Sequence, residues 1–254
     1  MRVYASVFEI TRKESMLCVF CREDKMIREE RKQELMKLME ESGYCTVEYL
    51  AARLFTSKST IRRNLAELEH LGFVKRSYGG AELRETIDYI PVKLRYQKNQ
   101  GLKDKIAREA VKRIEDNSVI FIDASSTCLH MIPHIHACKN ITVYTNSLEI
   151  CSLLAATGIP TYCLGGQLLP RSLAFAGAPA VQMAQSLYFD ALFFSCSGYA
   201  EEIITDYSEE EAYLRRTLLQ QSAKKYFLCD STKLGKRFTY VLCKRADVTE
   251  IITD

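Results

Sequence analysis

The sequence predicts an α/β protein in which a small helical unit precedes an open, mostly parallel sheet. Two observations support this fold class. The first third of the chain contains closely spaced helical patterns separated by short turns. Beyond about residue 102, short apolar runs rich in β-formers alternate with helical stretches, as they do in βαβ units.

The composition is that of an ordinary globular protein with a sizeable core. The chain has 254 residues, of which 47% are hydrophobic and 26% are charged. Its 35 basic and 32 acidic residues leave a net charge of +3, too small to indicate a globally charged partner surface. No run approaches the roughly 18–20 uncharged residues of a membrane span, and the N-terminus lacks a signal-peptide core. We therefore expect a cytoplasmic protein with no membrane partner.

The ten cysteines are scattered through apolar segments, so we expect reduced, mostly buried thiols rather than a disulfide framework. Cys18 and Cys21 form the only C-x-x-C pair. Zinc would need two further ligands, and the nearby candidates are Cys45 and His70. We expect neither a metal nor a cofactor.

Residues 1–25 have mixed charge and weak periodicity, and a strongly helical pattern begins at Met26. Met26 is therefore a candidate initiating residue, with an ordered N-terminal extension as the alternative. On the first interpretation, a chain that begins at Met26 should fold and bind its partners like the full chain.

Residues 26–83 predict a helix, a short helix, a turn, a third helix and a small hairpin. The first helix ends at Ser42-Gly43, where glycine is favoured, and Thr46 begins the second. Ser57 is placed to cap the third helix, which Gly72 closes. The apolar faces of the three helices comprise Leu35, Leu38 and Met39; Val47, Leu50, Ala51 and Leu54; and Ile61, Leu65, Leu68 and Leu71.

The apolar stripe of the third helix leaves polar side chains on or beside its exposed face near the N-terminus. These are Lys58, Ser59, Thr60, Arg62, Arg63 and Asn64. Between Arg53 and Gly80 the chain has six basic and two acidic residues, a local excess of +4. This excess lies where a recognition helix and its neighbour would meet a polyanion.

Residues 84–101, which are polar and contain one proline, predict a connection to a second domain over residues 102–254. Five apolar runs in that domain are typical of strands buried on both faces, at 119–122, 141–144, 160–164, 191–194 and 226–229. Helical patterns lie between them, for example over 148–156 and 209–222.

A polar cluster follows each of the five predicted strands. Because ligands bind at the carboxyl edge of an open α/β sheet, the clusters predict a crevice suited to a phosphorylated polyol. Arg171 and Lys233 are the cations in these loops that could balance a phosphate. Taken singly, each cluster is equally explained by helix capping. The candidate effector-binding residues are Asp123, Ser125, Ser126, Thr127, Asn146, Gly165, Gly166, Arg171, Gly198, Glu210 and Lys233.

Two other groups of residues have simpler explanations. His130, His134 and His136 lie on or just after one helix without partners that would complete a metal site, so we expect an ordinary surface role. The run Glu209-Glu210-Glu211 places favourable charge at a helix N-terminus. No catalytic triad or metal motif is present, and we predict no catalytic residue.

Two sets of residues resemble a known family. Ser57, Thr60-Ile61-Arg62-Arg63, Leu65, Leu68-Glu69 and Tyr78-Gly79-Gly80-Ala81 resemble the winged helix-turn-helix of the DeoR family of bacterial transcriptional regulators. The second set resembles the C-terminal sensor domain of that family: Asp123, Thr127, Thr145-Asn146, Leu164-Gly165-Gly166, Ser197-Gly198, Thr205-Asp206, Glu209-Glu210-Glu211-Ala212, Asp230-Ser231, Lys233 and Ile252-Thr253-Asp254.

The resemblance covers roughly residues 26–254. It implies a DNA-binding repressor, dimeric or tetrameric, with a Rossmann-like sensor that is similar in fold to sugar-phosphate isomerases and responds to a phosphorylated sugar. Operator DNA would be contacted by the third helix and by Lys75 and Arg76 of the wing.

The sequence departs from the family pattern in four places. Asn64 stands where Asp is usual, and Thr56 replaces a usual valine in the turn. Ser125 occupies a position that is commonly glycine, which predicts a less close approach to a phosphate. The chain stops at Asp254, where members usually continue for another strand or so.

Two alternative functions remain open from the residues. A sugar-phosphate isomerase with an accessory domain would use Asp123 or Glu210 as base and Lys233 on the phosphate. A purely structural oligomerisation module would bind no ligand. The basic helix-turn-helix, for which an isomerase has no need, favours the regulator.

Overall fold

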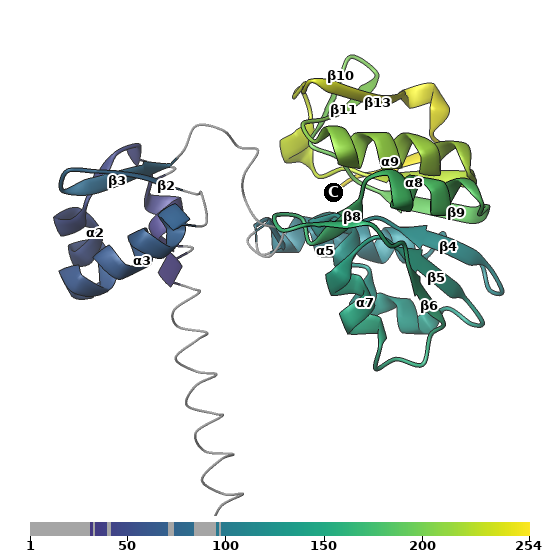
Figure 1. Cartoon of the computed structure of the whole chain (residues 1–254), viewed down its shortest axis with the longest axis horizontal. Coiled ribbons are helices and arrows are strands. Elements are labelled where there is room, and N and C mark those ends of the chain that lie inside the picture. Colours follow the sequence, from purple (N-terminus) through teal and green to yellow (C-terminus); the bar gives the residue numbers. More distant parts are fainter. Residues whose placement is uncertain (1–30, 33, 40–41, 71–73, 84–94, 97) are drawn as a thin grey trace, which may run out of the picture. The chain divides into compact units, whose positions relative to one another are not determined.

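The computed structural model describes residues 31–32, 34–39, 42–70, 74–83, 95–96 and 98–254. The chain divides into two compact units, Met1–Tyr89 and Ile90–Asp254, which are described separately (Figure 1). The predicted extension 1–25, Met26, Leu71, Gly72 and most of the predicted connection 84–101 lie outside the described residues.

The N-terminal unit is a winged helix-turn-helix, as predicted. Helical residues within 31–42 precede α2 (Val47–Arg53) and α3 (Lys58–His70). Thr46 caps α2 by accepting from the Tyr49 N–H, and Ser57 Oγ accepts from the Thr60 N–H at 3.1 Å. A small antiparallel sheet in the order β1-β3-β2 forms the wing; its strands are β1 (Cys45–Thr46), β2 (Val74–Ser77) and β3 (Gly80–Leu83).

The C-terminal unit is built on a six-stranded sheet in which every neighbouring pair is parallel. The order is β14-β12-β9-β4-β5-β6. Five of these strands are the predicted ones, and β14 adds a sixth beside β12. Their bounds are β4 (Val119–Ile122), β5 (Thr142–Thr145), β6 (Thr161–Cys163), β9 (Phe189–Phe194), β12 (Ser222–Leu228) and β14 (Glu250–Ile252).

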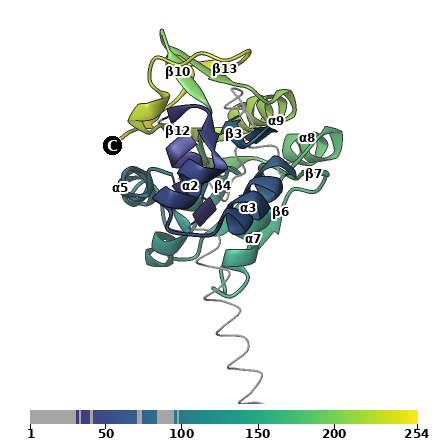
Figure 2. The same cartoon turned by 90° about the vertical axis from the view of Figure 1, so that its left-hand side faces the viewer.

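Helices cover both faces of this sheet (Figures 1 and 2). On one face, α5 (Gln100–Val111), α6 (Ser126–Leu129), the 3-10 helix 132–137 and α7 (Leu148–Leu154) pack on Ile120 and Phe193. On the other, α8 (Ala178–Gln185) and α9 (Glu209–Gln220) pack on Phe121 and Phe194. Successive strand residues point to opposite faces, so the predicted apolar runs supply both cores.

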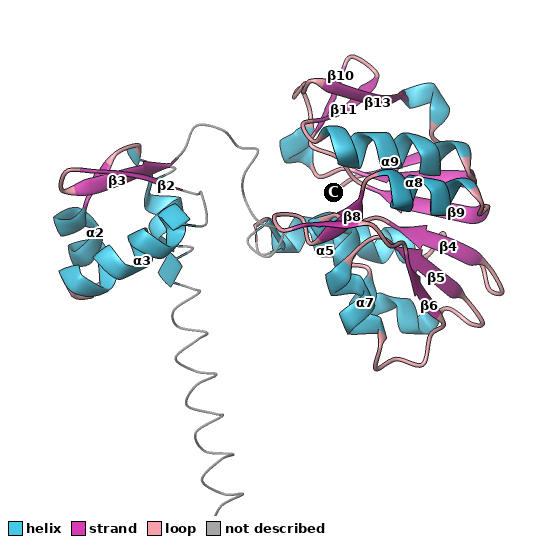
Figure 3. Ribbon diagram, viewed as in Figure 1, coloured by secondary structure: helices cyan, strands magenta, loops and turns pink. Residues whose placement is uncertain are grey.

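Smaller elements extend the carboxyl edge of the sheet (Figure 3). A hairpin of β7 (Gln167–Leu169) and β8 (Ala174–Ala176) follows β6. An antiparallel sheet is formed by β10 (Gly198–Ala200), β11 (Ile203–Asp206) and β13 (Tyr240–Lys244). Among the described residues, no helix has the length and apolarity needed to cross a membrane. The eight cysteines in that part of the chain are free thiols.

Candidate nucleic-acid and effector sites

The outer face of α3 presents two arginines that are open to an incoming partner. Arg62 and Arg63 are exposed, and neither has a hydrogen bond or ion pair within the described residues. Lys58 is exposed and pairs with Glu48 at 2.8 Å, while Ser57 Oγ contacts both Ser59 Oγ and Thr60 Oγ1. These contacts hold the N-terminus of α3 and leave its two arginines available.

The wing carries two further predicted cations, both paired with carboxylates. Lys75 Nζ lies 3.8 Å from Glu82, and Arg76 binds Glu69 through its guanidinium at 3.4 Å and its backbone N–H at 3.1 Å. Exposed pairs of this kind contribute little stability, so a phosphate can replace the carboxylate at small cost.

Asn64 does not lie on the exposed face, contrary to the prediction. Its side chain is fully buried, and neither its amide nitrogen nor its oxygen has a hydrogen-bond partner in the part of the unit that the structure describes. The reason is its spacing, because position 64 follows Ile61 by three residues and precedes Leu68 by four, which places it on the apolar stripe. Asn64 therefore faces the core of the unit and not a ligand.

We expect Asn64→Leu to stabilise the N-terminal unit by about 1–3 kcal/mol, because it removes an unpaired buried amide and keeps a similar volume. Native-state hydrogen exchange of α3 amides in the full chain measures this change. Asn64→Asp buries a carboxyl instead and should destabilise. Equal exchange rates in wild type and Asn64→Leu would mean that the amide has a partner in solution.

In the C-terminal unit, the loop after β4 contacts residues that follow other strands, as the sequence predicted. Ser126 Oγ accepts from Lys103 Nζ at 3.2 Å, and Thr127 Oγ1 accepts from Lys233 Nζ at 3.2 Å. Lys233 also donates to Ser195 Oγ at 2.6 Å and lies 3.5 Å from Asp230. Two lysines therefore meet adjacent hydroxyls, and we call Lys103, Ser126, Thr127 and Lys233 the cationic end of the site.

Lys103 is 4% exposed, and its ammonium also donates to the carbonyl of Arg95. Burial lowers the pKa of Lys103 to about 7, and the Lys233 charge adds to this effect, whereas Asp230 opposes it. The Lys103 ammonium has no carboxylate within ion-pair distance among the described residues. A bound anion would supply that missing charge.

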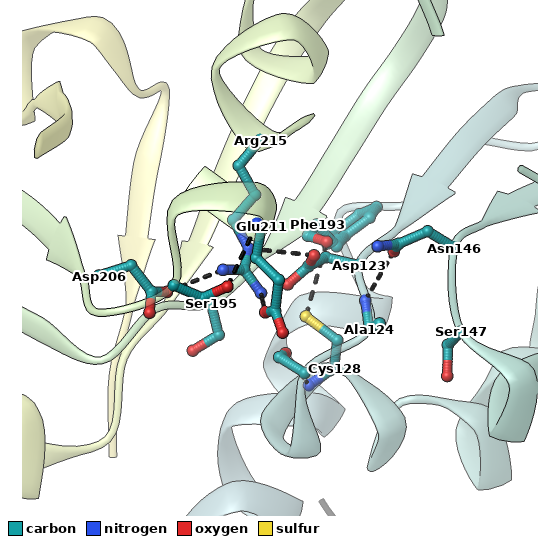
Figure 4. Close-up of polar contacts among 12 residues, drawn as sticks. Asp123, Ala124, Cys128, Asn146, Ser147, Phe193, Ser195, Asp206, Glu211 and Arg215 are labelled. Atoms are coloured by element: carbon teal, nitrogen blue, oxygen red, sulfur yellow. Dashed lines mark hydrogen bonds and ion pairs between the residues drawn. The ribbon is translucent and has the colours of Figure 1, made fainter. Parts of the chain in front are cut away.

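A buried ionic cluster lies at the other end of the same loop (Figure 4). Arg215 of α9 is 4% exposed and binds three carboxylates: Asp123 at 3.1 Å, Asp206 at 2.8 Å and Glu211 at 2.8 Å. Glu211 and Arg215 are four residues apart on one face of α9, Asp123 follows β4, and Asp206 ends β11. We call these four residues the acidic cluster.

The acidic cluster holds more negative than positive charge. Burial raises the pKa of Asp123 to about 6, with Glu211 and Asp206 adding to it and Arg215 opposing it. Asp123 Oδ2 is buried and has no hydrogen-bond partner within the described part of the chain. Buried polar atoms are nearly always paired, so this oxygen is a candidate acceptor for a ligand hydroxyl.

Several predicted effector residues make structural contacts within the protein. Asn146 accepts from the Ala124 N–H at 3.0 Å and donates to the Phe175 carbonyl at 3.2 Å, and Ser125 Oγ caps α6 through the Cys128 N–H. A Cβ at Gly166, where φ is +134°, would lie 2.4 Å from the Ala176 carbonyl oxygen, and one at Gly198 would lie 2.4 Å from that of Lys236. Close backbone approach within the protein accounts for these two glycines.

Two of the remaining predicted residues are exposed. Arg171 and Glu210 are exposed, and Glu210 accepts from Ser208 Oγ at 3.4 Å, whereas its neighbour Glu211 is the one that joins the acidic cluster. Gly165 has open space around the position of a Cβ.

The histidines differ from the predicted surface role in one case. His130 is 6% exposed, its ring stacks on Tyr96 at 4.1 Å between centroids, and its Nε2 donates to the Tyr96 carbonyl at 2.9 Å. His134 is more exposed and contacts Asp104 at 2.7 Å. No group of three or more potential metal ligands occurs in the described part of the chain.

Sequence reasoning did not find Lys103, Arg215 or Arg95. Lys103 and Arg215 carry a recognisable signal, since each is a charge on an otherwise apolar helix face, beside Ile106 in α5 and Leu218 in α9. Arg95 lies in the segment predicted as connection, where no pattern distinguishes it.

A winged helix-turn-helix joined to an α/β unit with a polar carboxyl edge defines a two-unit, DNA-binding transcription regulator. Residues 31–86 match the model of a DeoR-like helix-turn-helix domain, and residues 98–254 match that of the DeoR C-terminal sensor domain. The chain therefore belongs to the DeoR family.

Curated relatives agree with this assignment. The lactose phosphotransferase system repressor of Staphylococcus epidermidis is 30% identical over 234 residues, covering 90% of this chain and 93% of that protein. An uncharacterised HTH-type transcriptional regulator of Bacillus subtilis, FruR, is 32% identical over 231 residues, covering 90% and 92%.

Solved structures share parts of the fold at low identity. Ribose 5-phosphate isomerase A from Methanocaldococcus jannaschii is 20% identical with a TM-score of 0.41, covering 55% of this chain and 56% of that chain. The eIF2B delta subunit from Chaetomium thermophilum is 14% identical with a TM-score of 0.48, covering 78% and 64%. Likeness at this level does not bear on function.

Proposed function

We propose that the protein represses a sugar-catabolism operon and that a phosphorylated sugar, bound at the carboxyl edge of the C-terminal sheet, changes its affinity for operator DNA. The observation that carries this proposal is the loop 123–127, which meets the buried Lys103 ammonium and the partly buried Lys233 ammonium at one end and a carboxylate cluster at the other. We also propose that it acts in the cytoplasm as a dimer or tetramer, since helix-turn-helix proteins read paired half-sites.

The charge distribution supports a ligand that is anionic at one end and hydroxylated at the other. Lys103 and Lys233, with the Ser126 and Thr127 hydroxyls, offer charge-assisted donors to a phosphate. Asp123 Oδ2 offers an unpaired acceptor to a sugar hydroxyl. Names of the curated relatives support the sugar assignment, because one is a lactose phosphotransferase system repressor.

The bound sugar is proposed to be sensed and not consumed. Asp123, which the isomerase hypothesis would use as a base, is bonded to the Arg215 guanidinium, and the other candidate base, Glu210, is exposed. The named sequence relatives are transcription regulators.

A thermal-shift screen against hexose and pentose phosphates tests the proposal. A ligand that binds the native state raises the unfolding midpoint in a concentration-dependent way. The best ligand should then change the affinity for a DNA fragment that the wild-type protein selects from a random pool. Turnover of any sugar phosphate would favour the enzyme, and the absence of all ligand binding would favour a structural module.

We expect Arg62→Ala and Arg63→Ala to weaken DNA binding without affecting the fold, because both side chains point away from the core. Loss of a bidentate base contact should cost about 1–3 kcal/mol and relax specificity at one base pair, whereas loss of a phosphate contact should flatten the salt slope by about one unit. Fluorescence anisotropy measures both effects. Lys224→Ala, in the C-terminal unit, is the control; if both α3 variants also bind like wild type, the assignment of α3 is wrong.

Ligand binding at Lys103 should take up protons above pH 7. Burial and the Lys233 charge lower the pKa of Lys103 to about 7, with Arg95 and Lys98 contributing and Asp230 opposing. At about pH 8 the side chain is mostly neutral in the free protein, and an adjacent phosphate would restore its charge with uptake of about one proton. Calorimetry in two buffers of different ionisation enthalpy measures the uptake. Lys103→Met should remove it, and equal uptake in both proteins would contradict this role.

A further inference from the structure

The residues that precede and begin α5 are attached directly to the candidate effector site. We call Arg95, Tyr96 and residues 98–103 the strap. At its end, the Lys103 ammonium donates both to the Arg95 carbonyl and to Ser126 Oγ, the latter at 3.2 Å. One side chain therefore connects the start of the strap to the loop 123–127.

Two more contacts fasten the strap to the same edge of the sheet. The Tyr96 ring stacks on His130, and the Tyr96 carbonyl accepts from His130 Nε2 at 2.9 Å. Asn99 Nδ2 contacts Thr232 Oγ1 at 3.5 Å, in the turn that also carries Lys233. The strap thus touches both loops that supply the cationic end.

The strap also carries a charge that acts on the acidic cluster. The Glu211 carboxyl is buried, which would raise its pKa, but the charges of Arg215 and Arg95 keep that pKa below its usual value. Arg95 Nε is itself buried, without a hydrogen-bond partner among the described residues. The Arg95 side chain therefore interacts electrostatically with Glu211 of the acidic cluster, while the Arg95 carbonyl accepts from Lys103 of the cationic end.

The strap lies near the start of the C-terminal unit, which begins at Ile90. Residues 84–94 separate Arg95 from β3, the last strand of the wing. In sequence, the strap therefore directly follows the segment that leads from the DNA-binding unit.

We propose that the strap is the element through which effector binding is transmitted, and that the anionic group of the effector tightens it by binding the Lys103 ammonium. This inference rests on the proposed function and adds its mode of regulation. An ammonium has three N–H donors, and Lys103 uses two of them on described residues, Arg95 and Ser126. The anion would accept from the third, which also favours the charged form of Lys103 and so strengthens its bond to the Arg95 carbonyl.

Hydrogen exchange and DNA affinity, both measured on the full chain, test this relay. The probe is inorganic phosphate, with chloride at matched ionic strength as the control. We expect phosphate to slow exchange of the amides of residues 98–103. We also expect it to change DNA affinity, within the 5- to 150-fold range that is usual for coupled sites.

Variants of Tyr96 and Asn99, which we call the anchor residues of the strap, distinguish effector binding from its transmission to the DNA-binding unit. Tyr96→Ala and Asn99→Ala remove strap contacts but no group proposed to bind the effector, so phosphate affinity should stay within about threefold while most of the DNA response is lost. Tyr162→Ala removes another stacked tyrosine, whose partner is Tyr144, and should retain the full response. Asn99→Ala keeps the test decisive if Tyr96→Ala fails to fold.

The outcomes distinguish the two proposals. Phosphate binding with unchanged exchange in the strap, or a full DNA response in both anchor variants, would overturn the relay and leave the effector site standing. Failure of the wild-type protein to bind phosphate or any sugar phosphate would instead overturn the proposed function.

Discussion

Arg215→Met is expected to lower the free energy of unfolding of the C-terminal unit by about 3–5 kcal/mol, a large share of the stability of a typical domain. The substitution keeps much of the side-chain volume but removes the single guanidinium that binds Asp123, Asp206 and Glu211. These carboxylates are at most 9% exposed, so water cannot replace the lost donor.

The loss of unfolding free energy in Arg215→Met should depend on pH, because its cause is the unpaired charge of the buried carboxylates. Arg215 lowers the pKa values of Asp123 and Glu211 in the wild type, so without it both pKa values in the folded state rise, above those of the same carboxyls in the unfolded chain. The folded state then binds more protons than the unfolded state, so stability falls as pH rises. The difference between variant and wild type should therefore be largest near pH 8 and shrink toward about pH 5.

Thermal and urea unfolding at several pH values measure this effect. Arg216→Met is the matched control, because Arg216 is the next residue of α9 and contacts only the Val241 carbonyl among the described residues. A pH-independent loss would indicate that packing, rather than charge, explains the effect of Arg215→Met. A loss below 1 kcal/mol would mean that the acidic cluster is open to solvent.

The fold was predictable where the chain repeats a simple pattern. The runs at 119–122 and 226–229 are apolar at consecutive positions, whereas a strand buried on one face alternates apolar and polar residues. Both runs form interior strands of the parallel sheet. The helical spacing of Ile61, Leu65 and Leu68 predicted the buried face of α3, and all three side chains are buried. In contrast, β14 and the pairs β7-β8 and β10-β11 are strands of three or four residues with mixed polarity, which periodicity cannot detect.

The candidate site was predictable only from the strand ends. Asp123, Thr127 and Lys233 each follow a strand. Because ligands bind at the carboxyl edge of such a sheet, the sequence predicts that these residues lie in one site. Arg215 and Lys103 come from helices that pack on the faces of the sheet, and Arg215 meets Asp123 across 92 positions of sequence. No local pattern specifies which helical side chain reaches a distant loop, because that depends on how the helix rotates and slides on the sheet.

The error at Asn64 has a related cause. Its polar side chain led to a predicted place on or beside the exposed face, whereas the helical period relative to Ile61 and Leu68 puts it on the apolar stripe. The period proved to be the better guide, since Asn64 is fully buried. The lesson is that a polar residue at a stripe position should be assigned by its spacing.

Lys233→Met is expected to weaken effector binding by about 2–5 kcal/mol, or roughly 30- to 4,000-fold in the dissociation constant. Lys233 is the cation shared by three strand ends, because its ammonium contacts Thr127, Ser195 and Asp230. The side chain is 17% exposed, so a phosphate beside it would be largely shielded from water and the interaction correspondingly strong.

Calorimetry with the best ligand from the thermal-shift screen measures the loss. Lys236→Met, at an exposed lysine three residues further on, should bind the ligand like wild type. Arg171→Ala should have a smaller effect than Lys233→Met, since Arg171 is exposed, whereas Lys233→Arg should recover part of the affinity because it keeps the charge. Because Asp230 loses its ion-pair partner in Lys233→Met, the thermal midpoint without ligand must be compared first. A folded Lys233→Met protein that binds the ligand with unchanged affinity would show that the phosphate lies elsewhere.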